Sequence, residues 1–260
     1  MSDLAMRLTA RPLYLQVRDA LVARVTAGEW KPGGALPNEI HLAQEMQISV
    51  GTVRKALDIM VSERIVTRHQ GRGTFVNDFG ASNAPSLFST IFDSTEQPVS
   101  GEKRVKSMVR VPAGDEHASR LGLRTDDEVI KIERLRFHGR TCFMIETCLL
   151  PSKFYNRFPD DGASSRISAL AQLNGLVVGR AVEQVDIVMA DEDDAKDLGI
   201  AQNTPLLRLD RHVFSNLEHM LEWRVARCFL RNERYLVHFN PRTPPSTGDR
   251  SHFRDPSVAR

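Results

Sequence analysis

Residues 68–76 read RHQGRGTFV, with an arginine held between two glycines and followed directly by a short apolar strand. Glycine tolerates positive φ and allows close backbone approach, so Gly71 and Gly73 predict the tip of a tight β-hairpin. Arg72 is then carried on that tip. A cation on a narrow projection suits a groove or a phosphate, but the hairpin alone is equally consistent with a solvated charge. The segments that flank the hairpin decide between these two interpretations.

Three helices are predicted upstream of this hairpin. Apolar side chains recur at helical spacing between residues 11 and 30, and Gly28 is a typical helix stop. Asn38 is placed to cap a short second helix, and Ser49 to cap a third helix over residues 50–63. The outward face of the third helix holds Gly51, Thr52, Arg54, Lys55 and Asp58. Two short helices joined tightly and followed by two strands predict a winged helix-turn-helix, with Arg72 on the wing.

Composition sets the outer limits of what the chain can be. Its 260 residues, 41% hydrophobic and 26% charged, suffice for one large or two ordinary globular domains. No apolar run approaches about 18 residues and the N-terminus lacks the core of a signal peptide, which predicts a cytoplasmic protein without a membrane partner. Three scattered cysteines predict reduced thiols and no metal site. A net charge of +2 does not indicate a nucleic-acid partner by itself, but bases outnumber acids between Ser49 and Val76.

Beyond residue 103 the hydrophobic period changes from 3.6 to 2. Strands are expected over 128–137, 141–150, 176–190, 205–214, 218–229 and 234–240. Two helices are expected to interrupt them, at 165–174 and 191–200. Short turns such as residues 138–140 predict a mainly antiparallel sheet, so this part belongs to the α+β class.

The domain organisation expected from these patterns has four parts. Residues 1–78 form the winged helix-turn-helix domain, and residues 79–100, which are rich in Gly, Ser, Ala and Pro, form a linker. Residues 101–242 form the second domain. The polar, aperiodic residues 243–260 are expected to be a disordered tail.

A pair of arginines marks the candidate binding site of the second domain. Arg134 and Arg136 lie two residues apart on one predicted strand and therefore on the same face, and Glu146 follows on the returning strand. The face of Glu146 is expected to include Cys142, Met144 and Cys148. Guanidinium pairs suit a carboxylate or a phosphate, and Glu146 or Glu222 can accept hydrogen bonds from ligand hydroxyl or amine groups. Internal ion pairing fits the same spacing, so both interpretations stay open.

The segments LPNEIHLAQEM (36–46), ISVGTVRKALDIM (48–60) and HQGRGTFV (69–76) resemble, in this order and spacing, the DNA-binding domain of the bacterial GntR family of transcription regulators. The resemblance implies that the third helix enters the major groove of double-stranded operator DNA and that the wing tip reaches the minor groove. The DNA-binding residues it implies are Glu39, Ser49, Thr52, Arg54, Lys55, Gln70, Gly71 and Arg72. Val50 and Gly51 depart from the arginine and the Thr or Gln that the family often carries there. A base contact worth roughly 1–3 kcal/mol of discrimination is therefore expected to be missing.

Residues from about 100 to 240 resemble, more loosely, the UTRA effector-binding domain of the HutC subgroup, which has a chorismate-lyase-like fold. The resemblance rests on the arginine pair before a hairpin, the glutamate on the returning strand and the segments AKDLGI, LLRLDR and ERYLVHF. It implies an effector site made of Arg134, Arg136, Glu146, Ser165, Glu222 and Tyr235. Departures at Thr141, at Ile167 and in the turn 215–218 leave the ligand open among a sugar phosphate, a urocanate-like acid, a phosphonate and an amino acid derivative.

The function hypothesised from the sequence is a metabolite-responsive repressor. A homodimer would place two winged domains on a pseudo-palindromic operator, and a small anionic metabolite would change their separation. One alternative is an enzyme with lyase-like chemistry, although no nucleophile–base constellation or metal spacing supports it. Another is a sequence-independent DNA-binding protein, which the modest net charge argues against. No catalytic residue, metal or cofactor is expected.

Overall fold

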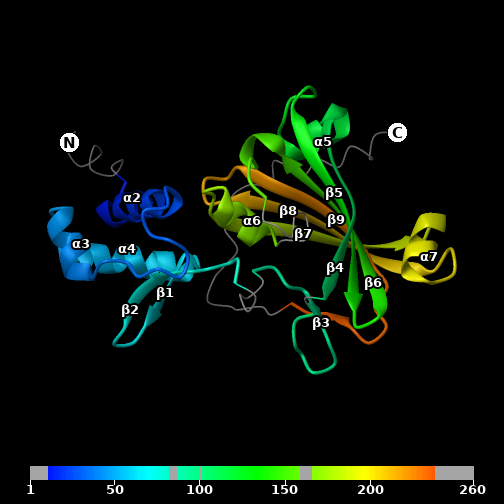
Figure 1. Ribbon diagram of the computed structural model, residues 1–260, viewed down its shortest axis with the longest axis horizontal. Coiled ribbons are helices and arrows are strands. Elements are labelled where there is room, and N and C mark those ends of the chain that lie inside the picture. The colour runs from blue at the N-terminus through cyan, green and yellow to red at the C-terminus, as the bar shows by residue number, and fades with distance from the viewer. Residues whose placement is uncertain (1–10, 82–86, 100, 159–165, 238–260) are drawn as a thin grey trace, which may run out of the picture.

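A computed structural model of the chain describes residues 11–81, 87–99, 101–158 and 166–237. Figure 1 shows an N-terminal group of helices with a small hairpin, beside a larger twisted sheet with its own helices. No helix within the described ranges is long and apolar enough to cross a bilayer. The predicted tail, residues 243–260, lies outside the described residues.

The N-terminal group follows the predicted winged helix-turn-helix order. Its elements are α2 (Leu13–Thr26), α3 (Glu39–Glu45), α4 (Val50–Ser62), β1 (Val66–His69) and β2 (Gly73–Val76). The side chain of Asn38 accepts a hydrogen bond from the His41 N–H at 2.8 Å, and that of Ser49 accepts one from the Thr52 N–H at 3.1 Å. Both predicted helix caps are therefore confirmed. The apolar helix faces meet in a core that includes Val17, Leu21, Leu42, Val53, Leu57 and Met60.

The second group is built on a six-stranded antiparallel sheet in the order β4-β5-β6-β9-β8-β7. Its strands are β4 (Glu102–Pro112), β5 (Glu128–His138), β6 (Thr141–Pro151), β7 (Val178–Met189), β8 (Pro205–Ser215) and β9 (Met220–Cys228). The helical elements are α5 (Gly114–Leu121), the 3-10 turn η1 (Ser152–Phe154), α6 (Ile167–Leu173) and α7 (Glu192–Leu198). The predicted α+β class with a mainly antiparallel sheet is confirmed.

Helices and a small strand pair cover the two faces of the sheet. On one face, α5 packs over Leu149 and Trp223, and α7 packs over Ile145. On the opposite face, α6 packs over Ile132 and Cys148. The pair β3 (Ile91–Phe92) and β10 (Arg234–Tyr235) covers the rest of that second face, and its strands hydrogen-bond to each other rather than to the large sheet. Each face thus buries its apolar side chains under a separate layer.

The structure differs from the sequence analysis in two missed elements and one wrong prediction. The elements β4 and α5 were not predicted, because β4 is an edge strand exposed on both faces and so lacks clean hydrophobic alternation. A β-bulge between Arg136 and Phe137 pairs Phe137 with Cys142, whereas Arg136 pairs with Met144. Cys142 consequently packs under α7, on the face opposite Met144 and Cys148. The expectation that all three side chains share one face is wrong. All three cysteines are nevertheless buried and free, as predicted.

Candidate functional site

An arginine on the outward face of α4 is held by a carboxylate from α3. Arg54 Nε donates to Glu39 at 2.8 Å, and Arg68 on β1 contacts the other oxygen of Glu39 at 3.1 Å. Arg68 also pairs with Asp58. A phosphate and a carboxylate bind the same planar guanidinium, so a DNA backbone can replace Glu39 as the partner of either arginine. Glu39 therefore orients two cations, and Arg68 is a candidate that sequence reasoning missed.

The wing tip has the backbone that its two glycines predict. Gly71 has φ of 71° and Gly73 of 112°, and the Arg72 N–H donates to His69 O at 3.0 Å to close the turn. Gln70, Gly71 and Arg72 are exposed on this tip. The guanidinium of Arg72 is thus presented on a narrow projection that fits a groove.

The remaining candidates for DNA contact lie at the N-terminal end of α4. The hydroxyls of Ser49 and Thr52 are 2.8 Å apart, and the Lys55 ammonium lies 3.9 Å from the ring centroid of Tyr14. The helix end supplies backbone N–H groups and a partial positive charge, which favour a phosphate. The Arg54–Glu39–Arg68 contacts join α3, α4 and β1 into one exposed surface with this helix end.

The arginine pair of the second domain belongs to a buried ion cluster. Register places Arg134 opposite Glu146, and Glu146 contacts Arg134 at 3.1 Å, Arg136 at 3.5 Å and Arg224 at 2.8 Å. The side chain of Glu146 is 1% exposed. The internal pairing that the spacing allowed is therefore present, with Glu146 as its centre.

A second carboxylate extends the cluster toward the edge strand β7. Glu183 contacts Arg211 at 2.5 Å and Arg224 at 3.5 Å, and it accepts a hydrogen bond from the Tyr235 hydroxyl at 3.0 Å. Arg211 also donates to the Thr90 hydroxyl at 3.2 Å. We call the face that carries these side chains the arginine face, and it is formed by Lys103, Arg134, Arg136, Glu146, Glu183, Arg211, Glu222 and Arg224.

The electrostatics of the arginine face favour an added anion. Burial, together with the nearby Arg134, lowers the pKa of Lys103 to about 8. Burial alone would raise the pKa of Glu146, but Arg134 and the other arginines bring it well below its ordinary value. Glu146 is therefore ionised at neutral pH. The four arginines and Lys103 still outnumber the three glutamates among the side chains described on this face. Excess positive charge in a poorly hydrated place attracts an anionic ligand.

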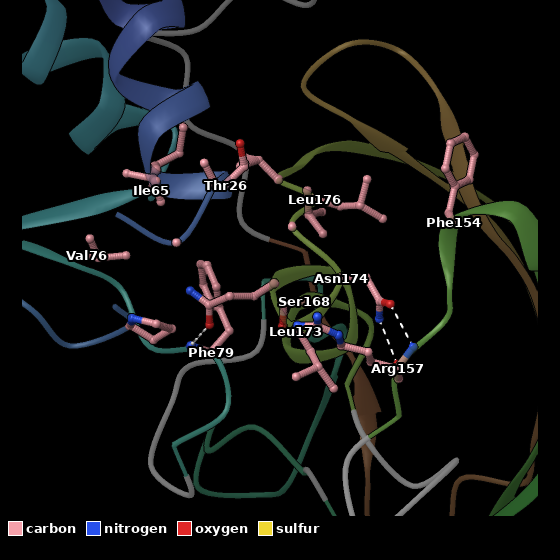
Figure 2. A pocket seen from close by; sticks show the side chains of 18 of the residues that line it. Thr26, Ile65, Val76, Phe79, Phe154, Arg157, Ser168, Leu173, Asn174 and Leu176 are labelled. Carbon is pink, nitrogen blue, oxygen red and sulfur yellow. Dashed lines mark hydrogen bonds between the residues drawn. The ribbon is translucent and has the colours of Figure 1, made fainter. Parts of the chain in front are cut away.

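A pocket of about 590 Å³ lies between the two groups of elements, away from the arginine face. Figure 2 shows Thr26, Ile65 and Val76 on its N-terminal side, and the α6 residue Leu173 on the other. Its lining includes none of the site residues that the sequence predicted. In the described ranges there is also no grouping of His, Cys, Asp or Glu that could hold a metal ion.

Comparison with known proteins agrees with this two-part architecture. The family of bacterial regulatory proteins named gntR matches residues 13–76, and the UTRA domain matches residues 97–235, which is more than half of the chain. The chain belongs to the GntR family, with a UTRA domain. As a member of this family it is a transcription regulator rather than an enzyme, and it binds operator DNA and a small-molecule effector.

Several curated relatives of this GntR-family regulator match over most of their length. The transcriptional repressor NagR of Bacillus subtilis is 27% identical over 89% of this chain and 96% of its own. The mannosyl-D-glycerate system repressor MngR of Escherichia coli is 29% identical over 76% of this chain and 83% of its own. The histidine utilization repressor of Pseudomonas putida is 25% identical over 78% of this chain and 83% of its own.

Solved structures show the same fold. The protein YydK of Bacillus subtilis superposes with a TM-score of 0.52 at 16% identity, over 88% of this chain and all of YydK. A GntR-family transcriptional regulator from Enterococcus faecalis has a TM-score of 0.50 at 16% identity, over 53% of this chain and all of its own. At this identity the likeness concerns the fold alone.

The structure of this GntR-family regulator brings most of the predicted effector residues together. Arg134, Arg136, Glu146 and Glu222 lie on the arginine face, and Tyr235 reaches it through Glu183. Ser165 lies outside the described residues. Sequence reasoning missed Thr90, Lys103, Glu183, Arg211 and Arg224. A signal was present for Arg224, which follows Glu222 by two residues and so shares its face of the strand.

The low pKa of Lys103 predicts a pH-dependent affinity for anions. As the pH rises through about 8, Lys103 loses its proton in the free protein, so the arginine face loses one positive charge. We expect the affinity for inorganic sulfate, whose own charge stays constant in this range, to fall as the pH rises from about 7 to about 9. Isothermal titration calorimetry measures this dependence. Lys103→Met should bind sulfate more weakly at neutral pH and lack the pH step, and an identical pH profile in both proteins would contradict the assignment.

Proposed function

We propose that this GntR-family protein is a repressor of a metabolic operon that leaves its operator when a small anionic metabolite binds the arginine face. The observation that carries the proposal is the buried excess of arginines in the UTRA domain, where burial makes each charge more effective than it is in water. The names of the relatives NagR, MngR and the histidine utilization repressor support the same role.

On the DNA side, the proposal assigns α4 to the major groove and the wing tip to the minor groove of a pseudo-palindromic operator. A homodimer would carry two such domains, with half-sites spaced by about one helical turn of DNA or a multiple of it. Residues 1–78 would form the DNA-binding domain and residues 101–242 the effector domain. Residues 79–100 would link the two, although Thr90 and β3 of this segment already lie against the effector domain. Such a regulator acts in the cytoplasm. Sedimentation of the purified chain tests the dimer.

On the effector side, the arginine face is suited to a phosphate or a carboxylate. The planar forks of Arg134 and Arg136 can bind two oxygens at once, and Glu146, Glu183 and Glu222 can accept hydrogen bonds from the hydroxyl or amine groups of the same ligand. A sugar phosphate, a urocanate-like acid, a phosphonate and an amino acid derivative all meet these requirements. The proposal therefore specifies an anionic metabolite with polar substituents.

Arginine variants of the DNA-facing surface test the first half of the proposal. Arg72→Ala should weaken binding of an operator obtained by selection from random duplexes, and should lower the salt dependence of binding by about one phosphate contact. Arg54→Ala should cost about 1–3 kcal/mol on the selected operator and relax the base preference, because Arg54 is 60% exposed on the helix assigned to the major groove. Fluorescence anisotropy at several salt concentrations measures both effects.

The matched control is Arg124→Ala, which removes an exposed arginine of the effector domain. Operator affinity should be unchanged in this variant. If the Arg124, Arg54 and Arg72 variants all lost the same operator affinity, the loss would come from the change in net charge and not from specific contacts. A wild-type protein that binds random duplex as tightly as the selected operator would favour the sequence-independent alternative.

A further inference from the structure

One side chain joins the effector domain to the DNA-binding domain. Gln172, on α6, donates from Nε2 to the backbone oxygen of Asn77 at 2.6 Å, and its Oε1 accepts from the Phe79 N–H at 3.0 Å. A single amide thus satisfies a backbone acceptor and a backbone donor two residues apart. Figure 1 shows α6 on the side of the sheet nearest the N-terminal helices. We call this pair of hydrogen bonds the Gln172 clamp.

One of the two residues that the clamp holds, Asn77, is hydrogen-bonded into the DNA-binding domain. The Asn77 N–H donates to Ile65 O at 3.0 Å, and Asn77 Nδ2 donates to Arg64 O at 2.6 Å. The Thr67 hydroxyl donates to Asn77 Oδ1 at 2.5 Å. Asn77 directly follows the wing strand β2 and is fixed to the end of α4 and to β1. A displacement of Gln172 is therefore transmitted to the wing and α4 together.

The rest of the joint is sparse. Val177 packs against the core of the N-terminal domain. The backbone of Gly175 approaches Thr26 so closely that an added Cβ would lie 3.1 Å from its carbonyl oxygen. The pocket of about 590 Å³ lies beside these contacts. A large part of the interface between the two domains is therefore not close-packed. Domains joined by a small interface move relative to each other by default, which leaves their orientation dependent on a few specific contacts.

The other side of α6 packs on apolar residues beside the arginine face. Leu170 and Ile167 pack with Ile132 and Cys148, and the Cys148 sulfur lies 2.9 Å from Arg134 Nη2. A ligand that moves Arg134 therefore acts on the surface against which α6 packs. The helix therefore lies one side chain, Cys148, away from Arg134 on one side, and it holds the DNA-binding domain on the other.

We infer that Gln172 is a positioning residue for operator binding, through which the occupant of the arginine face sets the orientation of the DNA-binding domain. The inference rests on the proposed function and adds the contact that connects its two halves. Coupling between two sites requires an element whose arrangement both sites bias, and α6 with its clamp meets that requirement. Without the clamp, the orientation that fits the operator becomes one of several, and operator affinity falls in proportion to its population.

The isosteric variant Gln172→Glu tests the clamp. A carboxylate still accepts from the Phe79 N–H but cannot donate to the Asn77 carbonyl, which it repels. Spin labels on cysteines at the exposed positions Gln44 and Lys196, one in each domain, report the interdomain distance by pulsed electron resonance. We expect a broader distance distribution in Gln172→Glu than in the wild type, and an operator dissociation constant raised about fivefold or more. The matched control Gln184→Glu, at an exposed position on β7, should change neither measurement.

Each outcome decides a separate point. An unchanged distance distribution in Gln172→Glu, or equal broadening in Gln184→Glu, would overturn the positioning role. A broader distribution with unchanged operator affinity would overturn the link from orientation to DNA binding. Gln172→Ala removes both hydrogen bonds without adding a charge and should reproduce the effect of Gln172→Glu. If the thermal midpoints of both variants stay close to that of the wild type, the effect comes from the lost clamp and not from a folding defect. A wild type that binds no selected operator would instead refute the proposed function, while the distance measurement would still test the clamp.

Discussion

Replacing Glu146 by alanine is expected to lower the free energy of unfolding of the effector domain by about 3–5 kcal/mol, because removal of one partner leaves buried charges uncompensated. Glu146 is the shared partner of Arg134, Arg136 and Arg224, at 3.1, 3.5 and 2.8 Å. Without it, these three guanidiniums lose their shared anionic partner and repel one another more strongly, although Arg224 keeps its contact with Glu183. The chain has two tryptophans, Trp30 in the N-terminal domain and Trp223 in the sheet. Urea unfolding in a Trp30→Phe background therefore reports the effector domain through Trp223.

Controls separate this effect from the loss of an ordinary ion pair. Glu102→Ala removes an exposed partner of Arg104 and should change stability by about 1 kcal/mol or less. Glu146→Gln keeps a hydrogen-bond acceptor but not the charge. Its loss in free energy of unfolding should lie between the losses of Glu102→Ala and Glu146→Ala. Because the folded-state pKa of Glu146 lies below its ordinary value of 4.5, its contribution is complete at neutral pH and declines as the pH falls below that value. A Glu146→Ala protein as stable as Glu102→Ala would show that the cluster contributes little.

The winged domain could be predicted in detail because its signals are local. The caps at Asn38 and Ser49 act on backbone groups only three residues away, and positive φ at Gly71 and Gly73 is a property of the residues themselves. No long-range contact had to be known for these assignments. The Glu39 contacts with Arg54 and Arg68, which join residues far apart in the sequence, were not foreseen.

The effector site was predicted only in part, since its assembly depends on strand order and register. Arg134 and Glu146 are neighbours across a single hairpin, so their contact follows from local pairing. Arg211 and Glu183 join them only because β8 and β7 continue the same sheet beyond β9. The bulge after Arg136 also reverses the side of Cys142, which strict alternation cannot indicate.

The clamp between the domains illustrates the same limit. Gln172 is an ordinary polar residue near the end of a predicted helix, and its partners are the backbone groups of Asn77 and Phe79. Backbone partners leave no signature in side-chain pattern, so the sequence contained nothing that pairs residue 172 with residue 77. The sequence did predict a covalent linker between the two domains. The structure adds the noncovalent contact at Gln172.

In the Arg134→Ala variant, operator binding is expected to persist while its response to the effector is lost. Arg134 lies on the arginine face, far along the chain from the wing and α4, and Glu146 retains Arg136 and Arg224 as partners when Arg134 is removed. The DNA-binding surface is thus left intact. The anionic end of the ligand, in contrast, loses its contact with the buried guanidinium of Arg134. Removal of a buried charged partner lowers ligand affinity much more than removal of an exposed one.

A thermal-shift screen against carboxylate and phosphate metabolites identifies the ligand for this test, since a compound at a hundred times its dissociation constant stabilises the protein by about 2.7 kcal/mol. The sensor would lie on the arginine face if a compound raises the thermal midpoint of the wild type, releases the wild type from the operator and leaves the thermal midpoint of Arg134→Ala unchanged. Arg134→Lys keeps the charge without the planar fork. A partial response in this variant would show that charge contributes to ligand binding, whereas no response would show that binding requires the bidentate geometry of arginine. Loss of operator binding and effector response together would instead indicate a folding defect. Full retention of both would move the effector site away from Arg134 and contradict the proposal.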